Sequence, residues 1–583
     1  MYRPEAASVS KATSSASGTS QSLGLDTTDS SFTQRAPISK IELVTLNPDI
    51  LGAVLEFVAG EDDYMPTIAA ITRTCKRMRL EGTKYLLSST VPKLQLIEDI
   101  CSFCHFMLAE PARLPLLKSL VLSCDSIEAD DHVRLVCEML RGLSNLHKLD
   151  IAFDTASSPS ARSAIAAAIA SLTSLRVLKL NEFGRLTTGY GPDYRARAGA
   201  LSSDHVFETA LRDARAPLLS LSIGLPSAVD ELAAGVRYSR RRDPIFLCSH
   251  LRHTLEHLEV LGGFSLIVRP GRTYEYPHLK KLTLPIYSIC IPYMRPFVIA
   301  APHLRELQIG GTDNSHTRHR HNEDILRGKI INRTQTPQEW RTTNEHDREV
   351  SNRSWPMLDS FKGAIIGAYS TGLTCPVARV HLLSTGGRRR TELAMLSIVL
   401  SDWRPSFLRL ATKTYRARGY IPLLPSTSSG WAEALETLEL RLNVVEDRFN
   451  LEECFDHIKE MLSNLPVISL RLELRCVNNR TQDLEDRHPP LDPFEGEECE
   501  IPGSDEPDAV CYLRNELLHE DLPRRVRESM RPAPALRRMT LAWGRCWQMN
   551  PNRVICVDLD NLPHTWDRPG NRSDGWCKFD TDW

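Results

Sequence analysis

One short stretch of the sequence carries the residue types of covalent haem attachment. Cys101, Cys104 and His105 match the C-x-x-C-H string. The string lies inside an apolar run from Leu94 to Leu108, where the two thiols and Leu108 continue the buried stripe of a predicted helix. We therefore interpret the cysteines as core residues and expect no cofactor. A haem or redox enzyme is the alternative, and it would show a Soret absorbance.

Two other groups of side chains have metal-binding or anion-binding chemistry. His316, His319 and His321 could coordinate a metal, but no carboxylate or cysteine stands at helical spacing beside them, so we predict an exposed polar loop and no metal site. Arginine triplets at 240–242 and 388–390 could hold a phosphate or an acidic peptide. Solvated surface positions are the default interpretation of both triplets.

The strings that mark common enzymes are missing from the sequence. It has no G-x-x-x-x-G-K-[ST] loop, no G-x-G-x-x-G turn, no G-x-S-x-G elbow and no H-E-x-x-H. A triad built from distant residues leaves no such string. With no catalytic residue indicated, the sequence favours a binding surface over an enzyme.

The composition is that of an ordinary globular protein. Of 583 residues, 71 are Lys or Arg and 73 are Asp or Glu, and the formal net charge is −2. This balance predicts no general attraction to nucleic acid or to an anionic membrane. The N-terminus lacks a secretory signal, and no apolar stretch reaches the roughly 20 residues that span a bilayer. We therefore expect an intracellular protein of the cytoplasm, the nucleus or both.

A repeated pattern, Leu-x-x-Leu-x-Leu, runs from about residue 114 to the C-terminus. The first three copies begin at Leu117, Leu146 and Leu175, 29 residues apart. Further copies begin at Leu218, Leu255, Leu279, Leu304, Leu435, Val467 and Leu536, with two poorer copies near Leu358 and Val377. The alternation that ends each copy predicts a short strand with one buried face.

Amphipathic segments separate several of these strands. We predict helices over 131–143, 160–172 and 451–465. One strand and one helix in each unit of 24 to 29 residues is typical of leucine-rich repeats, which stack into a curved solenoid. The predicted fold class is therefore α/β: an irregular leucine-rich-repeat solenoid over 114–583, with short parallel strands and outer helices.

Long steps between copies predict insertions. The steps from 304 to 358 and from 377 to 435 are filled mostly by polar residues, which we place in loops. We expect mobile insertions near 310–354 and 480–510. Residues 480–508 hold eleven acidic side chains, which could meet a basic partner or form a solvated, self-repelling loop.

The chain before the repeats has three parts. Residues 1–40 are rich in Ser and Thr and are predicted to be a disordered tail. Residues 41–91 form a predicted helical unit, in which Ile68, Ile71, Cys75 and Met78 make one apolar stripe. A linking helix is expected over 92–113. About fifty residues cannot build a large core, so the unit should need a partner or the following domain.

The helical unit and the repeats together resemble F-box proteins with C-terminal leucine-rich repeats, a type abundant in basidiomycete fungi. Residues 46–51 read LNPDIL, similar to the LPPEIL opening of the F-box, and residues 74–78 read TCKRM, similar to VCKRW. Residues 85–91, YLLSSTV, resemble the closing segment. Asn47 stands in place of a proline and Met78 in place of a large aromatic residue.

The resemblance implies a role and a set of contacts. In that family the F-box docks on the adaptor subunit of a cullin-RING ubiquitin ligase, and the repeats hold the protein target. The positions that would face the adaptor are Leu46, Pro48, Ile50, Leu51, Leu55, Cys75 and Lys76. A leucine-rich-repeat interaction scaffold without ligase association, in which the helical unit only caps the solenoid, is the alternative.

Outward residues of the strands are the candidates for target contact. They alternate with the buried leucines: Lys148, Asp150, Lys179, Asn181, His257, Glu259, Lys281, Glu306, Gln308, Glu439, Arg471, Glu473 and Arg538. Because their charges are mixed, we predict no strong preference for the sign of charge on the target.

Overall fold

The computed structural model describes residues 52–54, 57–58, 67–68, 70, 72–74, 76–124, 129–154, 159–183, 206–225, 244–262, 274–284, 294–310, 336–384, 389–415, 423–426, 430–445, 450–477, 521–531, 533–545 and 553–559. The chain divides into two compact units, residues 1–82 and 83–583.

The first unit is helical where the structure describes it, and α3 (Lys76–Ser89) begins there. Ile68 and Met78, two members of the predicted apolar stripe, are buried. The other two, Ile71 and Cys75, lie outside the described residues. Val54 and Phe57 are 41% and 78% exposed. The unit therefore leaves apolar side chains in solvent, as expected of a segment too small to bury them all.

The second unit contains one sheet, which in the described residues has fifteen strands in sequence order. Strands β1 to β14 are parallel, and β15 pairs antiparallel with β14. The strands are β1 (Lys93–Leu94), β2 (Ser119–Cys124), β3 (Lys148–Asp154), β4 (Val177–Phe183), β5 (Ser220–Leu225), β6 (His257–Gly262), β7 (Lys281–Leu284), β8 (Glu306–Ile309), β9 (Leu358–Ala364), β10 (Val377–Ser384), β11 (Phe407–Tyr415), β12 (Thr437–Val445), β13 (Ser469–Val477), β14 (Arg538–Arg545) and β15 (Arg553–Asp558).

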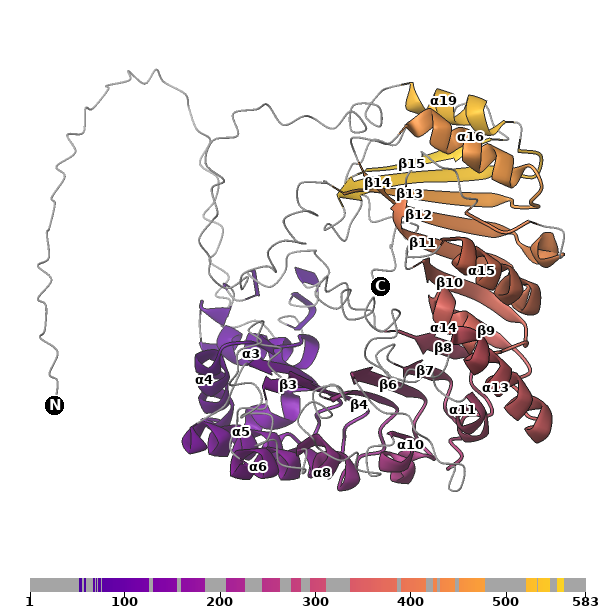
Figure 1. Ribbon diagram of the computed structural model, residues 1–583. Helices are drawn as coiled ribbons and strands as arrows, with labels where there is room; N and C mark the ends of the chain where they lie inside the picture. The colour runs from indigo at the N-terminus through magenta and orange to yellow at the C-terminus, as the bar shows by residue number, and fades with distance from the viewer. Residues whose placement is uncertain are drawn as a thin grey trace, which may run out of the picture. The chain divides into compact units, whose positions relative to one another are not determined.

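Helices cover one side of this sheet (Figure 1). They are α4 (Ile97–Leu108), α5 (Asp130–Gly142), α6 (Pro159–Ala170), α8 (Val206–Arg212), α10 (Pro244–Leu247), α11 (Met294–Ala300), α13 (Pro337–Ser351), α14 (Ile365–Ser370), α15 (Arg389–Trp403), α16 (Leu451–Leu462) and α19 (Leu522–Met530), with 3-10 turns η2 (Pro111–Leu116), η4 (Ser249–Leu251) and η6 (Trp431–Ala434). Parallel neighbours require a crossover connection, and successive crossovers on the same side leave the other face of the sheet without helices.

The strand register lines up the repeated leucines in one buried row. From β2 to β15 the row is Leu120, Leu149, Leu178, Leu221, Leu258, Leu282, Leu307, Phe361, Val380, Leu408, Leu438, Leu470, Met539 and Val557. None of these side chains is more than 4% exposed. The α/β class, the parallel strands and the outer helices predicted from the repeats are thus observed.

Three predicted helices coincide with α5, α6 and α16. In α5 the acidic Asp130 and Asp131 stand at the positive end of the helix dipole, and its buried face includes Val133, Val136 and Leu140. In α16 the Asn450 side chain caps the first turn by accepting from two backbone N–H groups. The amphipathic spacing of apolar residues therefore located these helices correctly.

The prediction of a loop throughout 310–354 was wrong, because α13 occupies 337–351. Its capping box pairs Thr336 with Glu339. The two residues that the helix buries are Arg341 and Asn344, both polar. An apolar periodicity could not reveal a helix whose buried face is polar.

The step from 377 to 435 is also not a polar loop. It contains α15 and β11, a complete additional helix and strand, with Leu408 and Leu410 buried in the sheet. In this copy Pro405 stands where other copies carry the leading leucine. The region 92–113 likewise is more than a linking helix, since β1 pairs with β2 and starts the sheet before residue 114.

Truncation of the buried row should destabilise the sheet locally. We expect Leu470→Ala to cost about 2–5 kcal/mol, because it removes a fully buried side chain between two strands. Ile468→Ala, two residues earlier and 38% exposed, is the matched control and should cost about 1 kcal/mol or less. The urea midpoint of unfolding and the amide exchange of β12 to β14 measure the stability of both variants. An equal loss of stability in the two variants would contradict the strand register.

Candidate functional site

The face of the sheet opposite the helices carries polar and charged side chains. The strand register places all thirteen predicted target-contacting residues on this face, alternating with the buried row. They extend from Lys148 on β3 to Arg538 on β14. Whether they contact a target stays a prediction. We call this surface the open face.

The open face of β2 to β8 is balanced in charge. Its described side chains include three lysines, Lys148, Lys179 and Lys281, and three carboxylates, Asp150, Glu259 and Glu306. Burial raises the pKa of Asp150, although the nearby Lys179 and Lys148 oppose the shift. Lys281 Nζ lies 3.6 Å from Glu306 Oε2 on the next strand. Opposite charges here neutralise one another.

The open face of β9 to β14 carries an excess of positive charge. Its described cations are Lys362, Arg379, Arg409, Arg441, Arg471, Arg475 and Arg538, and its described carboxylates are Glu439 and Glu473. Arg379 and Arg538 are exposed, whereas Arg409 is buried. We call these nine residues the arginine face.

Each glutamate of the arginine face is shared by two arginines. Glu439 pairs with Arg409 on β11, and its Oε1 lies 3.8 Å from Arg471 Nη1 on β13. Glu473 accepts from Arg441 Nε at 3.0 Å and from Arg475 Nε at 2.7 Å. Glu439 is thus held between arginines of the two adjacent strands, and Glu473 between one arginine of the adjacent strand and one of its own strand. These charge-assisted contacts hold the four arginines in place.

These ion pairs shift the protonation of their members. Burial opposes ionisation of Glu473, but Arg441 and Arg475 outweigh it and keep the pKa of the carboxyl below its ordinary value. Burial, together with the other arginines, lowers the pKa of Arg441 to about 10 even though Glu473 opposes the shift. Burial, with a smaller effect of Arg475 and Arg409, thus disfavours the charged form of Arg441.

His381 on β10 lies near three cations of the arginine face. Burial, together with the cations Arg409, Lys362 and Arg379, lowers the pKa of its imidazole to about 3. The ring lies 5.4 Å from the ring of Phe407 on the next strand. At neutral pH this side chain is therefore an uncharged hydrogen-bonding group in the middle of the arginine face.

Six residues of this region were missed by the sequence prediction: Lys362, Arg379, His381, Arg409, Arg441 and Arg475. Four of them lie on β9 to β11, whose copies of the repeat are poor or were not recognised. The other two follow the last leucine of a good copy. The alternation of polar and apolar residues continues through Arg441 and Arg475, and this signal would have found them.

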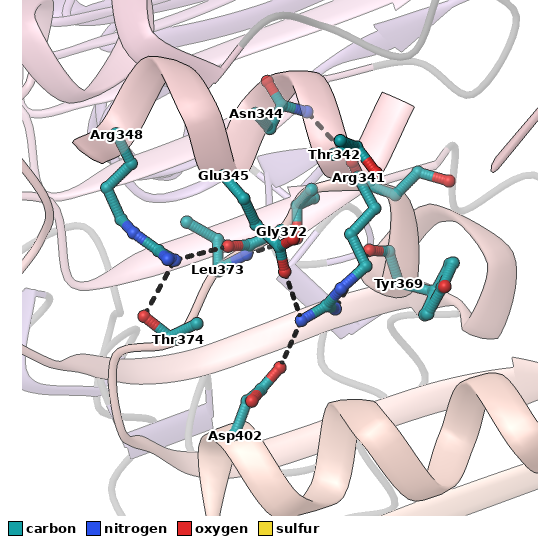
Figure 2. A network of polar contacts seen from close by, with 12 residues as sticks. Arg341, Thr342, Asn344, Glu345, Arg348, Tyr369, Gly372, Leu373, Thr374 and Asp402 are labelled. Carbon is teal, nitrogen blue, oxygen red and sulfur yellow. Dashed lines mark hydrogen bonds and ion pairs between the residues drawn. The ribbon is translucent and has the colours of Figure 1, made fainter. Parts of the chain in front are cut away.

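A second polar network lies on the helix side of the sheet and joins α13, α14 and α15 (Figure 2). Arg341 Nη2 lies 2.7 Å from both Glu345 Oε1 and Asp402 Oδ2. Asn344 donates to the Ser370 carbonyl at 2.9 Å and accepts from the Met294 backbone N–H at 2.9 Å. Because these polar groups form hydrogen bonds and ion pairs with one another, we assign the network to packing of the helices.

Of the cysteine motif, Cys104 belongs to the core of the second unit, whereas Cys101 is half-buried and His105 is exposed. Cys104 is fully buried on α4 and its sulfur lies 3.6 Å from Met139 Sδ. Burial raises the pKa of this thiol to about 12. Among the described residues, no group of three His, Cys, Asp or Glu side chains could hold a metal ion. A protonated thiol packed against methionine fits the core interpretation of the motif.

Several other predicted positions lie outside the described residues. Of the seven predicted adaptor contacts, Lys76 alone is described; it is exposed at the start of α3. The histidines 316, 319 and 321, the arginines 240–242 and the segment 478–520 are also outside. Their proposed roles stay predictions.

Comparison with known proteins leaves the chain without an assigned family: no family model and no curated protein matches it. Within the described part of the chain, no helix combines the length and the apolar character needed to cross a membrane. The geometry of the open face therefore carries the functional argument.

The network on the helix side predicts a large effect of one substitution. Arg341→Met leaves Glu345 and Asp402 without their shared cation, and should destabilise the protein by about 3–5 kcal/mol. Arg305→Met breaks an exposed pair with Asp359 and should cost about 1 kcal/mol or less. Thermal and urea unfolding of both variants give the comparison. If Arg341→Met were as stable as the control, the network would not hold the helices together.

His381 predicts a pH dependence of stability. Its folded pKa, about 3, lies below the roughly 6.5 of an unfolded chain. The contribution of neutral His381 to the free energy of unfolding is therefore complete above pH 6.5. It is lost as the pH falls toward 3, because this histidine is protonated in the unfolded chain before it is protonated in the folded protein. We expect His381→Gln to reduce the loss of stability between pH 7 and pH 4.5. His303→Gln, at an exposed position, is the control, and identical pH profiles for the two variants would refute the assignment.

Proposed function

We propose that this protein is the substrate-recognition subunit of a cullin-RING ubiquitin ligase. In this proposal an F-box-like helical unit docks on the ligase adaptor, and a leucine-rich-repeat solenoid holds a protein target. The observation that supports the target-binding role is the open face of the parallel sheet, a polar surface without helices carried by a rigid buried row. The resemblance of residues 46–51 and 74–78 supports the ligase role.

The exposed apolar residues of the first unit support docking on a partner. Val54 and Phe57 follow the LNPDIL segment and lie in solvent. Met78, which stands where the F-box has a large aromatic residue, is buried, as a core anchor should be. A small helical unit with exposed apolar groups gains stability when a partner covers them.

The proposed mechanism is proximity. The subunit has no chemistry of its own and needs no cofactor; it raises the local concentration of a target lysine beside a charged conjugating enzyme. The proposal implies residence in the cytoplasm or nucleus, where ligase subunits and targets meet.

A leucine-rich-repeat scaffold without ligase association is the second candidate. The replacement of a proline by Asn47 and of an aromatic residue by Met78 favours it, because methionine fills an apolar space with less shape specificity. In this alternative the open face still binds a protein, but no ubiquitin is transferred.

A pull-down with purified adaptor subunit tests the ligase role. We expect the adaptor to retain the wild-type chain and to lose a Leu51→Asp, Leu55→Asp double variant, because two carboxylates would enter an apolar interface. The matched control is a Val350→Asp, Met357→Asp double variant, which changes exposed apolar residues of the second unit and should be retained. Failure of the adaptor to retain the wild type would leave the scaffold as the function.

A further inference from the structure

Charged side chains are distributed unevenly along the open face. The described residues of β2 to β8 balance three lysines against three carboxylates, whereas the arginine face sets seven cations against two. The whole chain has a net charge of −2. The excess is therefore local to six adjacent strands.

Within the described arginine face, the two carboxylates do not balance the seven cations. Glu439 and Glu473 neutralise two charges, although four arginines surround them. Arg379 and Arg538, at the two sides of this cluster, are exposed. The arginines next to the glutamates are fixed in place, so a ligand that binds them loses little side-chain entropy.

Burial, and after it the surrounding cations, disfavours positive charge on two side chains of this region. The imidazole of His381 is kept neutral, and the pKa of Arg441 is lowered despite its carboxylate partner. An anion bound to this surface would offset the repulsion among the cations, and partial desolvation would strengthen the attraction. Binding of an anion to this surface is therefore favoured.

We propose that the arginine face binds an acidic, carboxylate-rich segment of the target protein in extended conformation. This inference rests on the proposed function only for the role of the bound protein as a ligase target. Guanidinium groups match carboxylates in a planar, two-bond geometry. Six strands span about 24 Å, or about seven residues of extended chain, at the usual strand spacing of about 4.8 Å.

A polypeptide fits the arginine face better than a nucleic acid does. Glu439 and Glu473 stand among the cations, so they would face a continuous phosphate backbone with like charge. In a peptide, backbone N–H groups alternate with carboxylates, and those donors suit glutamate and neutral imidazole acceptors. The expectation of no charge preference is therefore replaced, because it rested on a list that omitted six residues of this region.

Two triple variants of the full-length chain test the proposal. Lys362→Gln, Arg379→Gln, Arg538→Gln removes three cations from the arginine face. Lys148→Gln, Lys179→Gln, Lys281→Gln removes three from the balanced strands and is the matched control, since both variants have the same net charge. The probe is a fluorescein-labelled peptide of alternating Glu and Ser, followed by anisotropy, with a Gln and Ser peptide as the uncharged comparison.

We expect the wild type and the control variant to bind the Glu peptide alike, and the arginine-face variant to bind about tenfold more weakly, which corresponds to about 1.4 kcal/mol. Added salt should weaken binding, and the Gln peptide should not bind. Circular dichroism confirms that both variants fold. Equal weakening of the two variants, or no binding by the wild type, would overturn the proposal.

Two further outcomes separate this proposal from its neighbours. Tighter binding of an oligouridine probe than of the Glu peptide, lost in the arginine-face variant, would overturn it in favour of a nucleic-acid surface. The assay contains no ligase component, so a failed adaptor pull-down with intact peptide binding rejects the ligase role alone. Retention by the adaptor without peptide binding rejects the acidic ligand alone.

Discussion

No strand of this protein can bury its own leucine, and the rest of the structure depends on that constraint. Leu438 is covered by Leu408 on one side and Leu470 on the other, and the same relation continues from Leu120 to Val557. A slip of one residue would turn the charged positions toward the helices, so burial of the row also fixes the register. Stability is shared between neighbours rather than held in one centre.

The same constraint leaves the open face available for recognition. Every second strand residue faces away from the helices, and its side chain contributes little to the row. Glu473 shows how charge is accommodated there: two arginines on its own and the adjacent strand offset the desolvation of its carboxylate. A surface that is ordered by ion pairs across rigid strands keeps its shape without a ligand.

The sequence predicted what burial of apolar side chains determines, and failed where polar groups are buried. Leucine spacing located the parallel strands and the helices α5, α6 and α16. It missed α13, because Arg341 and Asn344 replace apolar residues on the buried side. Leucine spacing also missed the arginine face. The poor copies of the repeat around β9 to β11 concealed the alternation of residues such as Arg409. The excess of cations is seen only when the six strands are placed side by side.

The two arginine-rich networks of the second unit differ in their balance of cations and carboxylates. This difference suits one network to packing of the helices and the other to binding of a ligand. Arg341 faces two carboxylates, Glu345 and Asp402, so its buried charge is fully compensated and an added anion would be repelled. On the arginine face the ratio is reversed, since each glutamate contacts two arginines. A network whose charges balance has little net attraction for another ion, whereas an unbalanced network attracts ions of the opposite sign. Among the described residues, the arginine face is therefore the better candidate for recognition, because its cations outnumber its carboxylates.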